Sequence, residues 1–196
     1  TVEAGSQVKM DTGLRQLTVN GTLSVTGTSS EPVLFTSVMD DSEGGDTNND
    51  GNATSPAEQD WREIFVTSGA SADLEHTLLR YGGALRGSPY WDYLGNLFNE
   101  GGVLSLDHVT STQGVRGVRS NGGTLEVSNS LLSSNSQDGL HAMNGTLKVV
   151  NSTIQQNGQY GLYTDGVSSP VVTNTAFLSN TSYAMYLYLP GNSPSP

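Results

Sequence analysis

Hydrophobic and polar residues alternate along short stretches of this chain, and each stretch ends in a turn-forming residue. The pattern is plainest in the C-terminal half, where Leu125 and Val127 recur as Leu147 and Val149. Alternation with a period of two predicts a β-strand with one buried face. No long window shows the 3.6-residue period of a helix, so we predict an all-β chain of short strands and tight turns.

The alternating stretches belong to a sequence repeat of about 22 residues. "TLEVSNSLLSSN" (124–135) matches "TLKVVNSTIQQN" (146–157), and "PVVTNTAFLSN" (170–180) follows with one residue fewer. Two columns of residues recur with this repeat. The first column comprises His76, His108, Asn129, Asn151 and Asn174, and the second comprises Gly82, Gly114, Asn135, Asn157 and Asn180. Repeats of this length with several short strands are typical of a parallel β-solenoid.

The residue types in the two columns predict two different roles. Gly and Asn tolerate a positive φ, so we expect a left-handed turn at the second column in each coil. We expect the first column to stack its side chains along the axis as an internal amide ladder. His76 and His108 would replace Asn in that ladder, and a metal site at this histidine pair is the less favoured alternative.

Two stretches interrupt the repeat, at residues 39–60 and 84–102. Insertions in a solenoid form loops, and such loops often carry function. We predict one β-helix domain over residues 1–190 with these two insertions. Residues 191–196 are rich in Pro and Ser, which indicates the start of a linker or tail.

The first insertion carries seven acidic residues and no basic one. Asp46, Asn48 and Asp50 alternate within it and are followed by a glycine, which is the start of a D-x-N-x-D-G calcium loop. Calcium prefers six to eight oxygen ligands, and alternating Asp and Asn side chains can surround it. The sequence therefore predicts a bound Ca²⁺ that orders this insertion.

The predicted calcium loop is not an EF-hand. The twelfth position, where an EF-hand has a bidentate glutamate, is Ala57, and neither flank reads as a helix. Asn52 would contribute its backbone carbonyl. The candidates to complete the oxygen shell are Asp40, Asp41, Glu58 and Asp60. The alternative is a solvated acidic loop with turn-forming Asn-Gly and Asp-Gly pairs.

The second insertion is rich in aromatic residues, namely Tyr90, Trp91, Tyr93 and Phe98. Exposed aromatic side chains can stack on sugar rings, so a carbohydrate-binding or polysaccharide-degrading, lyase-like β-helix is the alternative function. The favoured interpretation is that these side chains cover the flank of a coil. Catalysis would need paired carboxylates or a positioned base. Asp138 and Asp165 do not occupy matching positions, so we expect no enzymatic activity.

The acidic composition of this 196-residue chain excludes some classes of binding partner. Eight Lys and Arg residues oppose 19 Asp and Glu, for a net charge of −11. The lack of a basic cluster argues against nucleic acid and against an anionic membrane surface. No stretch is long and apolar enough to predict membrane insertion. Without cysteine, order must come from repetition, hydrogen bonds or metal. Abundant Asn, Ser, Thr and Gly with few lysines indicate an extracellular protein.

The N-terminal part carries a resemblance to a known family. The run "VNGTLSVTGTSSEPVLFTSVMDDSEGGDTNNDG" and the later "WREI" are similar to the first coils of right-handed parallel β-helix repeat regions in bacterial secreted and cell-surface, adhesin-like proteins. The repeat itself extends this resemblance over roughly residues 60–190. It implies a non-catalytic stalk, adhesin or filament module at the cell surface. Neighbouring domains or identical subunits would then dock onto the open solenoid ends.

Overall fold

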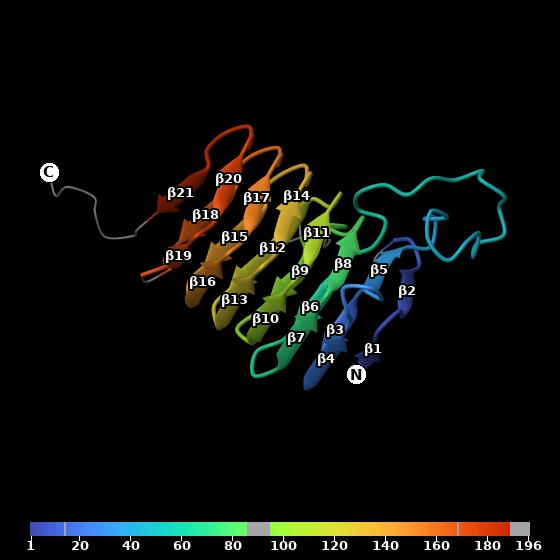
Figure 1. Ribbon diagram of the computed structural model, residues 1–196, viewed down its shortest axis with the longest axis horizontal. Helices are drawn as coiled ribbons and strands as arrows, with labels where there is room; N and C mark the ends of the chain where they lie inside the picture. Colours follow the sequence, from blue (N-terminus) through green and yellow to red (C-terminus); the bar gives the residue numbers. More distant parts are fainter. Residues whose placement is uncertain (14, 86–94, 168, 189–196) are drawn as a thin grey trace, which may run out of the picture.

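The computed structural model describes residues 1–13, 15–85, 95–167 and 169–188. These residues form three parallel sheets of seven strands each, and none of them is helical. Each turn of the chain places one strand in each sheet, so seven coils stack into an elongated solenoid (Figure 1). The predicted all-β parallel solenoid is therefore confirmed.

The three sheets run the length of the solenoid. Sheet A contains β1 (Val2–Glu3), β4 (Thr22–Thr26), β7 (Ser71–Glu75), β10 (Val103–Asp107), β13 (Thr124–Ser128), β16 (Thr146–Val150) and β19 (Val171–Thr173). Sheet B contains β2 (Gln7–Met10), β5 (Val33–Ser37), β8 (Thr77–Arg80), β11 (Thr110–Thr112), β14 (Leu131–Ser133), β17 (Thr153–Gln155) and β20 (Ala176–Leu178). Sheet C contains β3 (Leu17–Val19), β6 (Ile64–Val66), β9 (Gly95–Asn99), β12 (Arg116–Asn121), β15 (Leu140–Met143), β18 (Leu162–Asp165) and β21 (Met185–Tyr188).

The core is a set of columns of like residues, one above another. In sheet C, Val118 pairs with Leu140 and Leu140 with Leu162, and all three side chains are fully buried. The alternating residues of the other sheets point inward in the same way, for example Leu125 against Leu147 in sheet A. Every coil therefore depends on the coils next to it for its apolar contacts, as expected for a solenoid.

The two predicted columns exchange their roles. All five residues of the first column have a positive φ, between 43° and 53°, so the left-handed turn lies there, at the bend from sheet A to sheet B. A second left-handed residue lies immediately before the second column, at Tyr81, Gln113, Ser134, Gln156 and Ser179. The prediction of a left-handed turn at the second column itself is therefore wrong.

The internal amide ladder belongs to the second column. Asn135 Nδ2 donates to Asn157 Oδ1 at 3.0 Å, and Asn157 Nδ2 donates to Asn180 Oδ1 at 2.9 Å. Gly82 and Gly114 continue the column where Asn96 fills the space instead, because a Cβ at either glycine would lie 2.7 Å from Asn96 Oδ1. Close approach, and not positive φ, explains glycine at these two positions.

The histidines of the first column lie on the outside of the solenoid. The rings of His76 and His108 stack with centroids 4.5 Å apart. His108 is exposed, and its Nδ1 is 2.9 Å from Asp107 Oδ2. The prediction that these histidines replace Asn in an internal ladder is wrong, since the left-handed backbone turns their side chains outward.

The second insertion is shorter than the sequence indicates. Residues 95–99 of the predicted insertion 84–102 form β9, and all five are buried. Phe98 therefore belongs to sheet C, where its ring lies 5.3 Å from that of Phe65. The first insertion, by contrast, falls between β5 and β6 as predicted.

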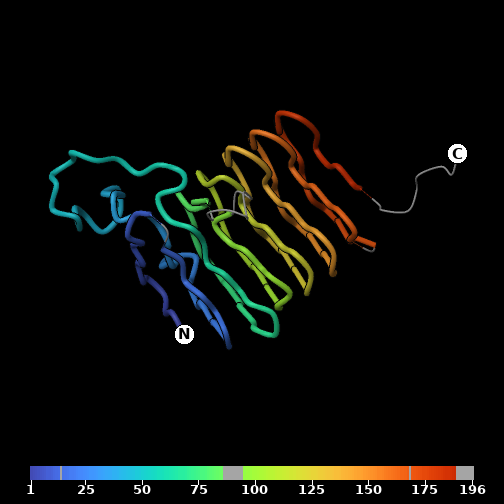
Figure 2. Tube along the Cα trace, turned by 180° about the vertical axis from the view of Figure 1, so that it is seen from behind, coloured from blue at the N-terminus to red at the C-terminus, as the bar shows by residue number. Residues whose placement is uncertain are grey.

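Both ends of the solenoid are open among the described residues. The strands β1, β2 and β3 end the three sheets on one side, and β19, β20 and β21 end them on the other. Figure 2 shows the same arrangement from behind, with the two terminal coils at opposite ends of the long axis. Across the described ranges, we find no helix of the length and apolar character that a membrane span would need.

Candidate metal site

The loop of residues 39–60 projects past the N-terminal coil in both views (Figures 1 and 2). Its two ends are fixed to the same residue of β8. At the start of the loop, the buried Asp40 carboxylate lies 2.7 Å from Nη2 of Arg80. At its end, the fully buried Trp61 donates from Nε1 to the Arg80 carbonyl at 2.9 Å. The loop thus leaves and rejoins the solenoid at neighbouring points.

A lysine of the first coil holds the base of the loop. Lys9 Nζ donates to the carbonyl of Asp40 at 2.8 Å and to that of Gly45 at 2.7 Å. Sequence reasoning missed both Lys9 and Arg80 as supports of the loop. They lie far from it in the sequence, and only the coil register brings them near.

Asp40 acts as an anchor of the loop. Burial opposes its ionisation, but hydrogen bonds from Ser42 and Thr36 and the charge of Arg80 outweigh this, so the pKa of Asp40 lies below its ordinary value. With its carboxylate engaged by these partners, Asp40 does not join the acidic group that could bind a metal. Of the four candidates to complete the oxygen shell, Asp41 is the one that lies with Asp46 and Asp50 in this acidic group.

The alternating acidic residues bend the loop into a tight turn. The Asp46 carboxylate accepts hydrogen bonds from the backbone N–H groups of Asp50 at 3.1 Å and Gly51 at 2.9 Å. Asp50 in turn accepts from the N–H groups of Asn52 at 3.1 Å and Ala53 at 3.0 Å. Gly51 has a φ of 75°, a value at which a side chain would be strained.

Three carboxylates meet at this turn. Oxygens of Asp41, Asp46 and Asp50 all lie within 4.8 Å of one another. Two oxygens at this turn, Asp41 Oδ1 and Asn48 Oδ1, are buried and accept no hydrogen bond. The Thr54 hydroxyl donates to Asp50 and is the main reason that the pKa of Asp50 lies below its ordinary value. Three converging carboxylates beside oxygens without hydrogen bonds could hold a metal ion.

Asp60, another predicted ligand, does not belong to this group. The Asp60 carboxylate accepts from the N–H of Ala57 at 3.0 Å. Asn52 lies in the same turn, and its carbonyl as a metal ligand stays a prediction. Tyr90, Trp91 and Tyr93, the candidate ligand contacts of the alternative function, lie outside the described residues.

A second feature is a polar groove along the bend between sheets A and B. Three adjoining cavities of about 230, 670 and 470 Å³ follow one another there and share lining residues. His76, His108 and Thr110 line the first two, while Asn151 and Thr153 line the last two. The lining contains amides, hydroxyls, the two stacked imidazoles and apolar side chains, and none of its residues is Asp, Glu, Lys or Arg.

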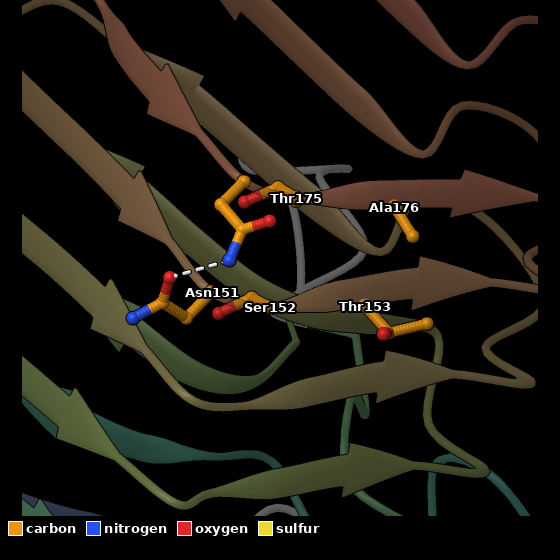
Figure 3. Close-up of a pocket in the computed structure, with 6 residues that line it drawn as sticks. Asn151, Ser152, Thr153, Thr175 and Ala176 are labelled. Atoms are coloured by element: carbon orange, nitrogen blue, oxygen red, sulfur yellow. Dashed lines mark hydrogen bonds between the residues drawn. The ribbon is translucent and has the colours of Figure 1, made fainter.

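Figure 3 shows the C-terminal part of this groove. Asn151, Ser152 and Thr153 lie on one coil, and Thr175 and Ala176 lie on the next. Asn174 Nδ2 donates to Asn151 Oδ1 at 2.8 Å, which keeps the two amides in line. The groove therefore presents similar polar groups at its surface once per coil.

A buried ionic cluster lies near the starts of β12 and β15. Arg116 Nε is 3.1 Å from Asp138 Oδ2, and His141 Nδ1 is 2.8 Å from the same oxygen. Burial opposes ionisation of Asp138, but the hydrogen bond from His141 and the charges of His141 and Arg116 leave the pKa of Asp138 below its ordinary value. Burial lowers the pKa of His141. Arg116 and Asp138 therefore form a buried ion pair.

The parallel sheets, the stacked columns and the internal amide ladder define a parallel β-helix. The family described as the right-handed beta helix region matches residues 96–194. The chain belongs to this family, which also establishes the predicted right-handed coil. Comparison with curated proteins and with solved structures gave no match.

Proposed function

We propose that this chain is a non-catalytic structural or adhesive β-helix module of an extracellular surface protein or filament, in which a calcium ion orders the loop of residues 39–60. The observation that carries the calcium site is the convergence of Asp41, Asp46 and Asp50 beside buried oxygens without hydrogen bonds. The asparagine- and threonine-rich composition, together with so few lysines, supports an extracellular location.

The donor set favours calcium over other metals. Every candidate ligand atom is a carboxylate or amide oxygen, and no histidine or cysteine belongs to the group. Hard oxygen ligands suit Ca²⁺ and Mg²⁺, whereas Zn²⁺ is usually bound by nitrogen and sulfur. Ca²⁺ accepts irregular shells of six to eight oxygens, which suits this irregular acidic turn better than the strict octahedron of Mg²⁺. A divalent cation would also relieve the repulsion among the three carboxylates.

Thermal unfolding with Ca²⁺ and with a chelator tests the site. At a free concentration of about 100 times its Kd, a ligand that binds only the folded state raises the free energy of unfolding by about 2.7 kcal/mol. For a domain of this size, that increase corresponds to a rise in Tm of roughly 5–10 °C. We expect Asp46→Asn and Asp50→Asn to abolish most of this rise. Asp73→Asn is the matched control, because Asp73 is an exposed acidic residue of sheet A outside the loop. A wild-type Tm that Ca²⁺ does not change would refute the site.

The polar groove favours glycan binding as a second candidate function. Its uncharged amides and hydroxyls, repeated once per coil, suit an extended neutral polysaccharide better than an acidic one. Calorimetric titration with neutral polysaccharides should then show binding that Asn151→Ala and His108→Ala weaken. Thr22→Ala, on sheet A outside the groove, should leave it unchanged. Release of shorter oligosaccharides during the titration would contradict the non-catalytic assignment.

A further inference from the structure

Exposed apolar side chains gather at the C-terminal end of the solenoid. Of the eight large hydrophobic residues that are exposed in the described chain, seven belong to the last coil. They are Val171, Leu178, Tyr183, Met185, Tyr186, Leu187 and Tyr188. Surface hydrophobic residues that occur singly need no explanation, but a cluster of this kind marks an interaction surface.

Two of these residues are core positions without a following neighbour. Met185 pairs with Leu162 and Leu187 pairs with Thr164, and both partners are fully buried inside the previous coil. β19, β20 and β21 are also the last strands of their sheets in the described chain, so their outer edges lack a pairing strand. This end therefore needs both apolar contacts and backbone hydrogen bonds.

The described part of the C-terminal coil has no charged side chain at its strand edges. Charged side chains at an edge normally prevent pairing with another chain. Here no Asp, Glu, Lys or Arg follows Asp165 in the sequence. The N-terminal coil, in contrast, carries Glu3, Lys9, Asp11 and Arg15, and the acidic loop projects past it (Figures 1 and 2).

We propose that the C-terminal coil docks against the C-terminal coil of a second copy of this chain, which gives a symmetric tail-to-tail dimer. Such a contact joins two uncharged apolar surfaces with free strand edges. Each copy then supplies apolar contacts and backbone hydrogen bonds to the other. It also keeps the two acidic loops at opposite ends of the assembly, which matters because each chain has a net charge of −11. A head-to-tail contact would place the charged N-terminal edge and its acidic loop against the apolar end.

Sedimentation velocity over a range of protein concentrations tests this proposal, with Ca²⁺ in excess so that the result does not depend on the state of the loop. We expect a monomer–dimer equilibrium without larger species. Leu187→Lys should raise the dissociation constant roughly 30-fold or more, because it places an unpaired charge in the interface. Val103→Lys is the control, since Val103 is equally exposed, at 51% against 49%, but lies in the middle of sheet A.

Single cysteines test the orientation, because the natural chain has none. With a flexible bismaleimide cross-linker, Thr181→Cys in the C-terminal coil should give cross-linked dimers, whereas Glu3→Cys in β1 should not. The cysteine test does not depend on whether Leu187→Lys folds. A wild-type chain that is monomeric at every concentration would overturn the proposal. A ladder of ever larger oligomers would overturn it as well, since it would indicate head-to-tail growth.

Discussion

Asparagine has two different roles in this solenoid, and the roles depend on where its side chain points. The fully buried Asn157 accepts hydrogen bonds from the backbone and the amide of Asn135, at 3.2 and 3.0 Å. Its own amide donates to the carbonyl of Leu132 at 3.1 Å and to Asn180. The exposed Asn174 makes one side-chain bond, to Asn151. Only the first role satisfies polar groups that water cannot reach.

We therefore expect Asn157→Ala to lower the free energy of unfolding by about 3 kcal/mol. The substitution leaves the buried N–H groups of Asn135 and the carbonyl of Leu132 without a partner, at about 1–3 kcal/mol for each such group. Asn174→Ala should cost less than about 1 kcal/mol, because water can replace its single exposed bond. Urea denaturation measures both values, and similar losses for the two variants would contradict this assignment of roles.

The acidic turn around Asp46 and Asp50 was predictable in part from the sequence. The spacing of Asp46 and Asp50 was enough to predict the turn, because its hydrogen bonds are local. The choice of Asp41 over Asp40 could not be predicted, because it depends on Arg80, which the coil register brings to Asp40. A short motif thus shows which residue types form the turn. The residues that hold the loop in place, such as Arg80, are distant in the sequence and are not visible in the motif.

At the scale of the coil, glycines recur at the turn that precedes the strands of sheet A. Some of them are required by the local structure, whereas others could be replaced by a residue with a side chain. Gly123 precedes β13 with a φ of 67°, and a Cβ there would lie 2.1 Å from the carbonyl oxygen of Gly102. Gly21 precedes β4 at the equivalent turn, yet it lacks a left-handed φ, and a Cβ there would meet nothing within 4 Å. The difference arises because the equivalent turn of the preceding coil packs directly beneath Gly123.

Gly123→Ala should therefore lower the free energy of unfolding by about 2 kcal/mol or more, from backbone strain together with the clash. Gly21→Ala, the matched control, should change it by less than about 0.5 kcal/mol. Chemical denaturation of both variants distinguishes the two cases. A neutral Gly123→Ala would mean that the neighbouring turn can move aside.

Strand positions were predictable because a buried face imposes a period of two on the sequence. Turn conformations were harder, since tolerance of positive φ permits a left-handed turn without requiring one. Gln113, Ser134 and Gln156 adopt that conformation although their residue types do not favour it. The strand at residues 95–99 was missed for a related reason. Asn96 and Asn99 are buried there by hydrogen bonds to neighbouring coils, so the stretch shows no apolar alternation.

At the scale of the whole molecule, the two ends of the solenoid are unequal. Val8 and Leu17 of the N-terminal coil are half-buried, and Lys9 ties β2 to the loop. Met185 and Leu187 of the C-terminal coil are 43% and 49% exposed. In a solenoid each coil is stabilised by its neighbours alone, so an end coil with fewer contacts opens first.

Hydrogen exchange read by mass spectrometry should detect this difference. In dilute protein, peptides from residues 171–188 should exchange before those from residues 1–19, and the central coils should exchange last. Raising the protein concentration should slow exchange in residues 171–188 alone, because the tail-to-tail contact covers that end. Leu187→Lys should remove this dependence on concentration while leaving exchange at residues 1–19 unchanged. Earlier exchange of the N-terminal coil would show that the loop and Lys9 do not secure it, and that the solenoid opens from the opposite end.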